Sequence, residues 1–418
     1  MKQMLHEMPC QGFGDECREA FPMLNITSNG HPFIYLNNAA TALTPQSVLD
    51  AMDEYYKEFG VNIFRGVDNI AYRATNAYEG SRKKVADFIG AKRTEEIVFT
   101  RGTTAAINLV ASSFGDVAVE ADSEIIVSST EHHANYVPWQ QLAKRKGAKL
   151  IVAPVNEQGQ LTPEKLTELI SDKTKIVAFA HISNVLGAMN DVKALADIAH
   201  AHGAVIVVDG AQGIVHDRVR VKDWGVDFYA FSGHKLFGPT GIGVLYGNFD
   251  HLDRMPPVEF GGEMIDRVDT YDSTWRQPPW RFETGTMPIA EAIGLGAAID
   301  FVNDWGYCGI QKRVHHLGTR MVEGLQNIPG VTIFNADNAY SGVVSYNVDG
   351  VHPHDASSIY DREGISLRAG HHFSQPTMRV LGQNATLRAS AAFYNTDEEI
   401  DRFLEVTESA GDWLDVLF

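Results

Sequence analysis

Apolar runs alternate with amphipathic patterns through the first two thirds of the chain, and this alternation constrains the fold more than any other feature. The apolar runs typical of buried strands are Ile125–Val127, Leu150–Ala153, Ile176–Ala180, Val205–Val208 and Phe228–Phe231. Helical periodicity separates several of them, at Asn135–Lys146, Pro163–Ile170 and Val192–Ala201. Strands that alternate with helices favour a mostly parallel sheet covered on both faces. Such a sheet binds ligands at the carboxyl ends of its strands.

The pattern changes after about Pro288. It predicts helices at Ile289–Asp304 and Ile310–Gln326, short strands at Val331–Phe334 and Val343–Val348, and a last helix that starts at the capping box Thr396–Glu399. This second part is typical of a smaller α+β domain. We therefore expect an N-terminal arm (1–24) that packs with the small domain, a large domain (25–288) and a small C-terminal domain (289–418). Near the start, Thr44 is the expected N-cap of a helix whose first residue is Pro45.

Composition excludes several classes of function. Lys and Arg number 35 and Asp and Glu number 53, which gives a formal net charge of −18 over 418 residues. Such a chain repels nucleic acid and acidic membranes, although a local basic pocket for a small anion is compatible with it. The cysteines, Cys10, Cys17 and Cys308, show no zinc-ligand spacing, so we expect no metal site. Without a secretory signal or an apolar span in the sequence, we expect a cytoplasmic protein.

Lys235 is the first candidate for chemistry. It lies in the glycine-rich segment Phe231–Gly241, directly after an apolar strand and beside Ser232 and His234. A lysine in this position can grip a phosphate as a fixed cation, or, when desolvated, act as a Schiff-base nucleophile. Taken alone, Lys235 is better explained as a solvated loop lysine.

Asp209 is the second candidate, at the end of the strand Val205–Val208. A buried carboxylate needs a positive or donating partner, and a pyridinium nitrogen is one such partner. The alternative is an aspartate that caps the next turn.

Two further segments follow strands. Thr103 and Thr104 come after Arg101-Gly102, where free N–H groups at a helix start would seat a phosphate, although such a sequence is also an ordinary N-cap. His132, in the segment Glu131–Asn135, could lie flat on a cofactor ring or act as an acid or base. In the small domain, Arg368 and Arg388 suit a substrate carboxylate, or else lie on the surface.

Taken in order, these motifs resemble the class V aminotransferase family, and within it the branch of cysteine desulfurases and selenocysteine lyases. The resemblance runs from about Asp15 to about Leu404. It implies the type I fold of enzymes dependent on pyridoxal 5'-phosphate (PLP), which is an α/β fold with a large domain built on a mostly parallel, seven-stranded sheet. The segments that carry it are Tyr35–Ala40, Arg101–Thr104, Glu131–Asn135, Ser183–Gly187, Val208–Gln212, Ser232–Lys235, Arg281–Thr286 and Arg368–His372.

The resemblance also implies a role for each matching residue. Lys235 would bind PLP covalently and move the α-proton of the substrate. Asp209 would pair with the pyridine nitrogen and Gln212 would reach the phenolic oxygen. His132 would stack on the ring as the second catalytic residue. The phosphate would be held by Thr104, Ser232 and His234, with Thr103 nearby. Thr286 would reach the cofactor from the other subunit of a homodimer with shared active sites.

The implied substrate is a small amino acid. Asn184 and Arg388 would hold its carboxylate, with Arg368 close by. Ala39, Arg65 and Phe373 complete the expected substrate-binding set.

One departure from this family bears on the reaction. Desulfurases of this branch carry a persulfide-forming cysteine directly after the Arg-x-Gly-His-His run, and Phe373 stands there in this chain. Ser374 follows, but a hydroxyl is a poor sulfur acceptor. Phe64 stands where desulfurases often carry a histidine. Both departures make the expected pocket more apolar.

The leading hypothesis is therefore a PLP-dependent lyase that cleaves a Cβ–S or Cβ–Se bond of a cysteine-derived amino acid. Class V aminotransferase or epimerase activity is the first alternative. A desulfurase that uses an external thiol acceptor and a PLP-binding scaffold without turnover are the others.

Overall fold

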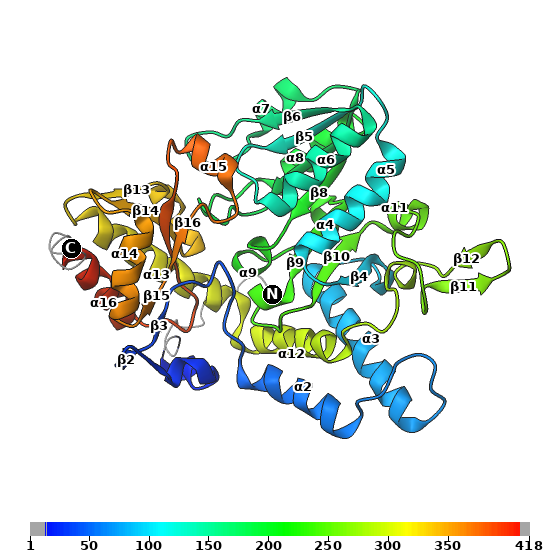
Figure 1. Ribbon diagram of the computed structural model, residues 1–418, viewed down its shortest axis with the longest axis horizontal. Helices are drawn as coiled ribbons and strands as arrows, with labels where there is room; N and C mark the ends of the chain where they lie inside the picture. The colour runs from blue at the N-terminus through cyan, green and yellow to red at the C-terminus, as the bar shows by residue number, and fades with distance from the viewer. Residues whose placement is uncertain (1–12, 14, 410–418) are drawn as a thin grey trace, which may run out of the picture.

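The structure, a computed structural model, describes residues 13 and 15–409 (Figure 1). Its centre is a seven-stranded sheet in which β10 is antiparallel to both neighbours and the other pairs are parallel. In spatial order the strands are β4 (Ile97–Thr100), β10 (Gly243–Gly247), β9 (Phe228–Ser232), β8 (Val205–Asp209), β7 (Thr174–Ala180), β5 (Glu124–Ser128) and β6 (Lys149–Ala153). The predicted parallel strands and the α/β class are confirmed.

Alternate residues of each central strand enter different cores, which explains why the strands are apolar throughout. In β8, Ile206 and Val208 belong to one core and Val207 to the other. The first core contains residues of α2 (Gln46–Glu58), α3 (Asn69–Ile89), α8 (Val192–Ala201) and α12 (Ile289–Trp305), and the second contains residues of α4 (Thr103–Ser112) and α6 (Val137–Lys146). Helices therefore cover both faces of the sheet, as predicted.

The second part of the chain forms a four-stranded antiparallel sheet with its own core. Its strands, in spatial order, are β13 (Val331–Ile333), β14 (Val343–Val348), β17 (Thr386–Ser390) and β16 (Arg368–Gly370). The helices of this part are α13 (Tyr307–Gln326), α14 (Pro353–Arg362), α15 (Gln375–Val380) and α16 (Asp397–Glu408). Ile34 and Leu36 lie in this core too, because β3 (Ile34–Tyr35) pairs with β15 (Ile365–Ser366). The domain boundaries at residues 24 and 288 stay predictions.

Shorter elements connect these bodies. They include α1 (Asp15–Arg18), η1 (Pro22–Asn25), β1 (Thr27–Ser28), β2 (His31–Pro32), η2 (Thr94–Glu96), α5 (Phe114–Ala118), η3 (His133–Asn135), α7 (Pro163–Leu169), α9 (Gly213–His216), α10 (Val221–Trp224), η4 (Gly233–Lys235), α11 (Phe249–Arg254), η5 (Trp280–Phe282) and η6 (Ala336–Ser341). The hairpin of β11 (Ile265–Val268) and β12 (Ser273–Trp275) projects from the body (Figure 1).

The described part of the N-terminal arm contacts the C-terminal segment. Arg18 Nη1 lies 2.7 Å from Glu399 Oε1, and Cys17 Sγ donates to the carbonyl of Phe393. Residues 1–12 and 14 of the arm lie outside the described residues.

Two predicted caps had different outcomes. The capping box of Thr396 and Glu399 at α16 is confirmed. The N-cap predicted at Thr44 is wrong, because Pro45 has an extended ψ of 157° and is itself the N-cap of α2. The N–H of Gln46 donates to the carbonyl of Ala20, so a contact with the N-terminal arm occupies the first helical donor.

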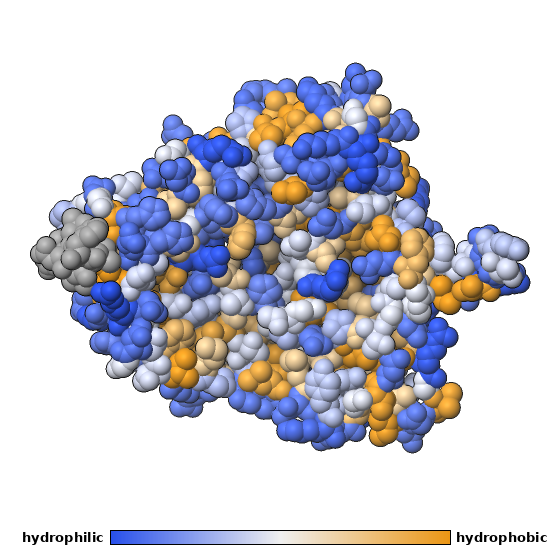
Figure 2. Space-filling model, viewed as in Figure 1, coloured by the Kyte–Doolittle hydropathy of each residue, from blue (hydrophilic) through white to orange (hydrophobic). Residues whose placement is uncertain are grey.

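The surface of this strongly acidic chain is mostly hydrophilic on the face that Figure 2 shows. Over the residues that the structure describes, no helix has the length and apolarity needed to cross a membrane. The same residues contain no cluster of side chains suited to hold a metal ion.

A buried ion pair links α3 to the segment after β12. Arg82 Nη1 lies 2.6 Å from Glu283 Oε1, and both side chains are almost fully buried. Glu283 also accepts hydrogen bonds from the Tyr78 hydroxyl and from the backbone N–H of Phe99 in β4. Because every partner of this carboxylate is buried, the segment that leads to Thr286 has one fixed position.

We predict that Glu283→Gln lowers the free energy of unfolding by about 3–5 kcal/mol, because it removes the buried counter-charge of the Arg82 guanidinium and leaves only the more exposed Glu79 as its ionic partner. Replacing both partners, as in Arg82→Met with Glu283→Leu, should restore much of the loss. Urea unfolding at one fixed protein concentration measures both effects. Equal stability of Glu283→Gln and the unmodified chain would contradict this account.

Candidate active site

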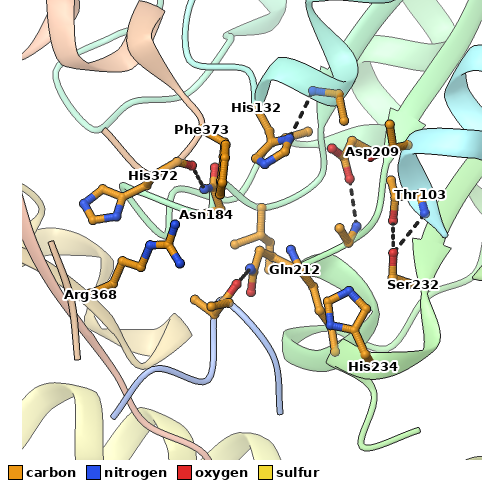
Figure 3. A pocket seen from close by; sticks show the side chains of 18 of the residues that line it. Thr103, His132, Asn184, Asp209, Gln212, Ser232, His234, Arg368, His372 and Phe373 are labelled. Atoms are coloured by element: carbon orange, nitrogen blue, oxygen red, sulfur yellow. Dashed lines mark hydrogen bonds between the residues drawn. The ribbon is translucent and has the colours of Figure 1, made fainter. Parts of the chain in front are cut away.

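One cavity of about 440 Å³ lies where the carboxyl ends of the central strands meet the small sheet. It brings together every residue that the sequence placed in the site except Thr286 and Arg65 (Figure 3). These lining residues are Ala39, Thr103, Thr104, His132, Asn184, Asp209, Gln212, Ser232, His234, Lys235, Arg368, Phe373 and Arg388.

Lys235 and Asp209 occupy neighbouring strand ends, in η4 after β9 and at the last residue of β8. Burial lowers the pKa of the Lys235 amine to about 8, an effect that Asp209 opposes and Arg388 reinforces. Burial also raises the pKa of Asp209, whose Oδ1 accepts a hydrogen bond from the N–H of Ala211. At neutral pH the amine is therefore partly unprotonated, which is the state that attacks a carbonyl carbon.

The chain after Asp209 is tightly packed. A Cβ atom on Gly210 would lie 2.0 Å from the ring of Tyr229, so only glycine fits there. This close approach fixes the direction in which the Asp209 carboxylate leaves the strand.

An anion seat forms where α4 begins next to the end of β9. The N–H of Thr103 donates to Ser232 Oγ at 2.9 Å, and the two hydroxyls are 2.8 Å apart. Gly102 has φ 140°, and a side chain there would press on Ser232 Oγ. The predicted helix start at this motif is confirmed, and its dipole points into the cavity edge that His234 also lines. Burial lowers the pKa of His234 to about 4, so this ring is neutral at pH 7.

His132 is held as one tautomer. Its Nδ1 accepts a hydrogen bond from the N–H of Ala134, so the ring proton lies on Nε2. Burial, followed by the charge of Lys235, lowers the pKa of His132 to about 3. The neutral ring faces the cavity (Figure 3), which suits stacking on a flat cofactor better than proton donation from a charged imidazolium.

The groups predicted to bind a carboxylate lie together, Arg388 in β17 of the small sheet and Asn184 after β7 of the central sheet. Arg388 Nη1 donates to the backbone carbonyl of Asn184, and Asn184 Nδ2 donates to the carbonyl of His372. Burial, followed by the charge of Arg368, lowers the pKa of Arg388 to about 9. The buried Nε of Arg388 has no hydrogen-bond partner among the described atoms, so it is an open donor for an anion.

Gln212 and Ala39 touch each other at the floor of the cavity. Gln212 Nε2 donates to the carbonyl of Ala39 at 2.7 Å, and its second proton remains available to a ligand oxygen.

The loop after β16 places Phe373 at the mouth of the cavity. Phe373 has φ 55° and remains 51% exposed. Its carbonyl accepts from the N–H of His133 at 2.7 Å, its N–H donates to His371 Nδ1, and its ring centroid lies 5.8 Å from that of His132. A left-handed backbone is costly for a bulky residue, so these contacts hold Phe373 in a conformation it would not adopt alone.

The neighbouring nucleophiles point elsewhere. Ser374 is fully buried, and its hydroxyl bonds to the carbonyl of Glu131 and to Thr377 Oγ1. Cys17 lies in the core near Phe393, and Cys308 lies in α13 beside a different cavity. Within the described part of the chain, no cysteine lines the active-site cavity.

Two predicted residues lie apart from this cavity. Arg65 is exposed and forms an ion pair with Glu263, with 3.0 Å between Nε and Oε1. Thr286 lines a separate cavity of about 590 Å³ together with Arg101 and Glu259.

Sequence reasoning missed two buried residues of the site. Glu131 accepts hydrogen bonds from Asn135 Nδ2 and from the N–H of Ala180, and burial raises its pKa to about 8. It therefore anchors the segment that carries His132. His372 lines the cavity and pairs with Thr386 Oγ1. Both residues belong to motifs noted in the sequence, but no local pattern tells which side chain of a motif turns inward.

Comparison with known proteins agrees with this geometry. The family model described as Aminotransferase class-V matches residues 34–403. The chain belongs to the class V aminotransferase family. It is 49% identical over 403 residues to a probable cysteine desulfurase of Halalkalibacterium halodurans, covering 96% of this chain and 99% of that one. It is 48% identical over 405 residues to a probable cysteine desulfurase of Staphylococcus aureus, covering 97% and 98%.

Solved structures show the same fold. The cysteine desulfurase CsdA of Escherichia coli, in S-sulfonic acid form, superposes with a TM-score of 0.90 at 38% identity, covering 99% of this chain and 100% of that one. The apo cysteine desulfurase of Thermococcus onnurineus NA1 gives a TM-score of 0.91 at 41% identity, covering 97% and 98%. The type I PLP fold predicted from the sequence is confirmed.

As a member of this family, the protein is a PLP-dependent enzyme, and the cavity fits that cofactor. The desolvated Lys235 amine suits a covalent link to the aldehyde. The buried Asp209 carboxylate suits a protonated ring nitrogen, and the seat at Thr103 and Ser232 suits the phosphate. When bound, PLP withdraws electrons from the α-carbon of an amino acid.

We predict that Lys235 in the cofactor-free protein titrates near pH 8, well below the ordinary lysine value of 10.5. Removing a group that raises the Lys235 pKa lowers the titration midpoint. Removing a group that lowers this pKa raises the midpoint. Asp209→Asn should therefore shift the midpoint down, and Arg388→Gln should shift it up. Reductive methylation with formaldehyde across pH, read by peptide mass spectrometry, measures the midpoint, and exposed Lys193 serves as the internal reference. A common midpoint for both lysines would contradict the desolvation account.

Proposed function

We propose that the enzyme is a lyase that cleaves the Cβ–S (or Cβ–Se) bond of a cysteine-derived amino acid in the cytoplasm. The observation that carries this proposal is the cavity wall at Phe373. An aromatic ring stands at the position where the resemblance to desulfurases calls for a sulfur-accepting thiol, and no described cysteine lines the cavity. A substrate whose sulfur group leaves unaided needs no such thiol.

The overall reaction balances with water as the only co-reactant. An S-substituted cysteine, R–S–CH₂–CH(NH₃⁺)–CO₂⁻, and water give the thiol R–SH, pyruvate and ammonium. The electron pair of the Cβ–S bond leaves with sulfur. The α-proton is lost to the enzyme and a proton returns to the product carbon.

The residues of the cavity suit these steps. Arg388 and Asn184 hold the α-carboxylate, which orients the substrate before any bond breaks. The Lys235 amine, with its pKa of about 8, is matched to take a proton from the α-carbon near neutral pH. The neutral rings of His132 and Phe373 limit the access of water from the mouth.

The position of Ser374 supports the same proposal, because this hydroxyl does not face the cavity as a sulfur acceptor. Its hydroxyl is held by Glu131 and Thr377 and is fully buried, so it does not replace the thiol.

A second candidate is a desulfurase that passes sulfur to a thiol on another molecule. The names of the relatives from Halalkalibacterium halodurans and Staphylococcus aureus favour it. Aminotransferase, epimerase and non-catalytic PLP-binding functions remain alternatives that the same assays separate.

We predict that the enzyme forms pyruvate from cystine or from S-conjugates of cysteine, and forms little sulfide and alanine from free cysteine. Assaying pyruvate, alanine, sulfide and substrate chirality on one panel of cysteine-derived amino acids checks this. Alanine formed from added pyruvate would instead mark an aminotransferase, and racemised substrate an epimerase. Alanine and sulfur transfer from cysteine only with an added thiol would mark the external-acceptor desulfurase.

Phe373→Cys tests the role of the ring directly. We predict that this variant acquires a persulfide and desulfurates cysteine, because it places a thiol at the mouth beside His132. Phe373→Ala is the matched control, since it removes the ring without adding a thiol. Mass spectrometry of the variant after exposure to cysteine detects the persulfide. An unmodified thiol would show that other residues redirect the chemistry.

We also propose a homodimer in which Thr286 of one chain completes the phosphate seat of the other. Thr286 is excluded from the cavity of its own chain, and apolar side chains remain exposed nearby, at Val258, Phe260 and Val268. Figure 2 shows apolar surface on the projecting hairpin of β11 and β12, which suits contact with a second copy.

Mixing two variants that are each impaired in PLP binding tests the shared site. Lys235→Ala removes the covalent anchor, and Thr286→Ala weakens the phosphate seat. If sites are shared, a mixed dimer contains one intact site, with Lys235 from one chain and Thr286 from the other. We predict that co-refolding restores tight PLP binding to part of the population, measured by equilibrium dialysis. If Thr286 serves its own chain, mixing restores nothing.

A further inference from the structure

Two side chains of the small sheet hold consecutive carbonyl groups of the loop that follows β7. Ser345 in β14 and Arg388 in β17 are direct partners across the antiparallel ladder, so both side chains leave the same face of the small sheet. Arg388 Nη1 donates to the carbonyl of Asn184 at 2.9 Å, and Ser345 Oγ donates to the carbonyl of Val185 at 2.6 Å. All four residues are buried. The small sheet therefore fixes two successive peptide groups of a loop that belongs to the central sheet.

The next carbonyl of the same loop is also held from this side. The carbonyl of Leu186 accepts a hydrogen bond from Asn335 Nδ2 at 3.0 Å and another from Asn338 Nδ2 at 2.9 Å, and both amides are buried. Gly187 then comes so close to η6 that a Cβ atom on it would lie 2.1 Å from Ser341 Oγ. Three carbonyls in a row, at positions 184 to 186, thus accept hydrogen bonds from side chains that come late in the sequence.

Asn184 is the residue of this run that lines the active-site cavity. Its Nδ2 donates one proton to the carbonyl of His372, and the second proton remains available to a ligand oxygen (Figure 3). Each peptide group is planar, so holding the two carbonyls that follow the Asn184 Cα atom restricts the direction in which its side chain leaves the backbone. The hydrogen bonds of the loop therefore set the position of the amide in the cavity.

The Val185 carbonyl depends on a single group. Among the described residues, Ser345 Oγ is the only donor to this carbonyl, whereas the carbonyl of Leu186 has two donors. Ser345 and Val185 are both fully buried, so water does not readily replace the hydroxyl. A buried carbonyl without a donor is costly, and the loop is expected to shift until the carbonyl is paired again.

We propose that Ser345 is a positioning residue for binding of the substrate α-carboxylate, and that it acts through the Val185 carbonyl on the Asn184 amide. Ser345 itself does not line the cavity. Because Ser345 and Arg388 extend from one face of the sheet to adjacent peptide groups, they set the separation between the Arg388 guanidinium and the Asn184 amide before a ligand arrives. The inference rests on the proposed role of Asn184 and Arg388 as the groups that hold the carboxylate.

Two ligands that differ only by the α-carboxylate test this role in the holoenzyme. L-2-Aminobutyrate carries the carboxylate and propylamine lacks it. Neither has a leaving group on its β-carbon, so neither undergoes β-elimination. Titration followed by the visible absorbance of the bound cofactor measures both affinities. Ser345→Ala should weaken the binding of L-2-aminobutyrate about three- to tenfold, the scale of one neutral hydrogen bond, and leave the binding of propylamine unchanged.

Tyr346→Phe is the matched control, because it also removes one buried hydroxyl, from the next position of β14. Tyr346 belongs to the core on the other face of the small sheet, where its hydroxyl donates to Tyr360 Oη. This variant should lower the melting temperature to an extent similar to Ser345→Ala. It should leave the affinity for L-2-aminobutyrate unchanged, because it does not loosen the loop.

Asn338→Ala loosens the same loop from a different element, and it keeps the inference testable if Ser345→Ala does not fold. It removes one of the two donors to the Leu186 carbonyl, and the other donor remains. We therefore expect a weaker effect of the same kind, a loss of affinity for L-2-aminobutyrate without a loss for propylamine. An unchanged affinity for both ligands would show that the loop does not position the Asn184 amide.

Two results with Ser345→Ala would overturn the proposal. An unchanged affinity for L-2-aminobutyrate would remove the positioning role, and equal weakening of both ligands would reduce Ser345 to a general structural role. Asn184→Ala is the reference variant. If it does not selectively weaken L-2-aminobutyrate, Asn184 is not a carboxylate ligand and the inference falls with that assignment. Failure of the lyase proposal is a separate outcome, recorded by the absence of pyruvate from sulfur conjugates, and it leaves these affinities unaffected.

Discussion

The desolvation of one amine, that of Lys235, underlies the chemistry that we propose for this protein. A lysine ammonium in water is a poor nucleophile and a poor base. Lys235 is partly buried in the cavity wall and forms no ion pair with any acid among the described residues. Burial lowers its pKa to about 8, and Asp209 keeps the shift from going further. The large, mostly parallel sheet makes this burial possible. Its neighbouring strands β8 and β9 end at one edge, and tight turns hold the residues that follow them.

The cavity depends on contacts between the two sheets as much as on either alone. The central sheet supplies Lys235 and Asp209, while the small sheet supplies Arg368 and Arg388. Hydrogen bonds join the two sides directly. The loop after β16 is bonded through Phe373 to His133, through Ser374 to Glu131, and through His372 to Asn184. These bonds give the mouth of the cavity a defined shape and explain how an aromatic residue with a strained backbone stays in place.

The sequence predicted much of this site because its signals are local. Each strand end carries its functional residue within a few positions of an apolar run, so Asp209, Thr103, His132 and Lys235 could be placed at one edge before any contact was known. The predictions that failed concern residues whose contact partners lie far away in the chain. The cap at Thr44 failed because Ala20 takes the first donor of α2. Arg65 and Thr286 lie outside the cavity of this chain, where no sequence pattern could locate them.

Sequence alone determined the architecture and the residue types of the site, because hydrophobic periodicity fixes which elements form and strand ends of a parallel sheet must meet at one edge. It also showed that an aromatic residue follows His372. Only the tertiary structure decided that this ring faces the Arg368 guanidinium, that Ser374 turns inward, and that Ser345 and Arg388 hold consecutive carbonyls of one loop. These features depend on burial and on contacts such as that of Ser374 with Glu131, far apart in the chain, and neither burial nor long-range contact has a local signature.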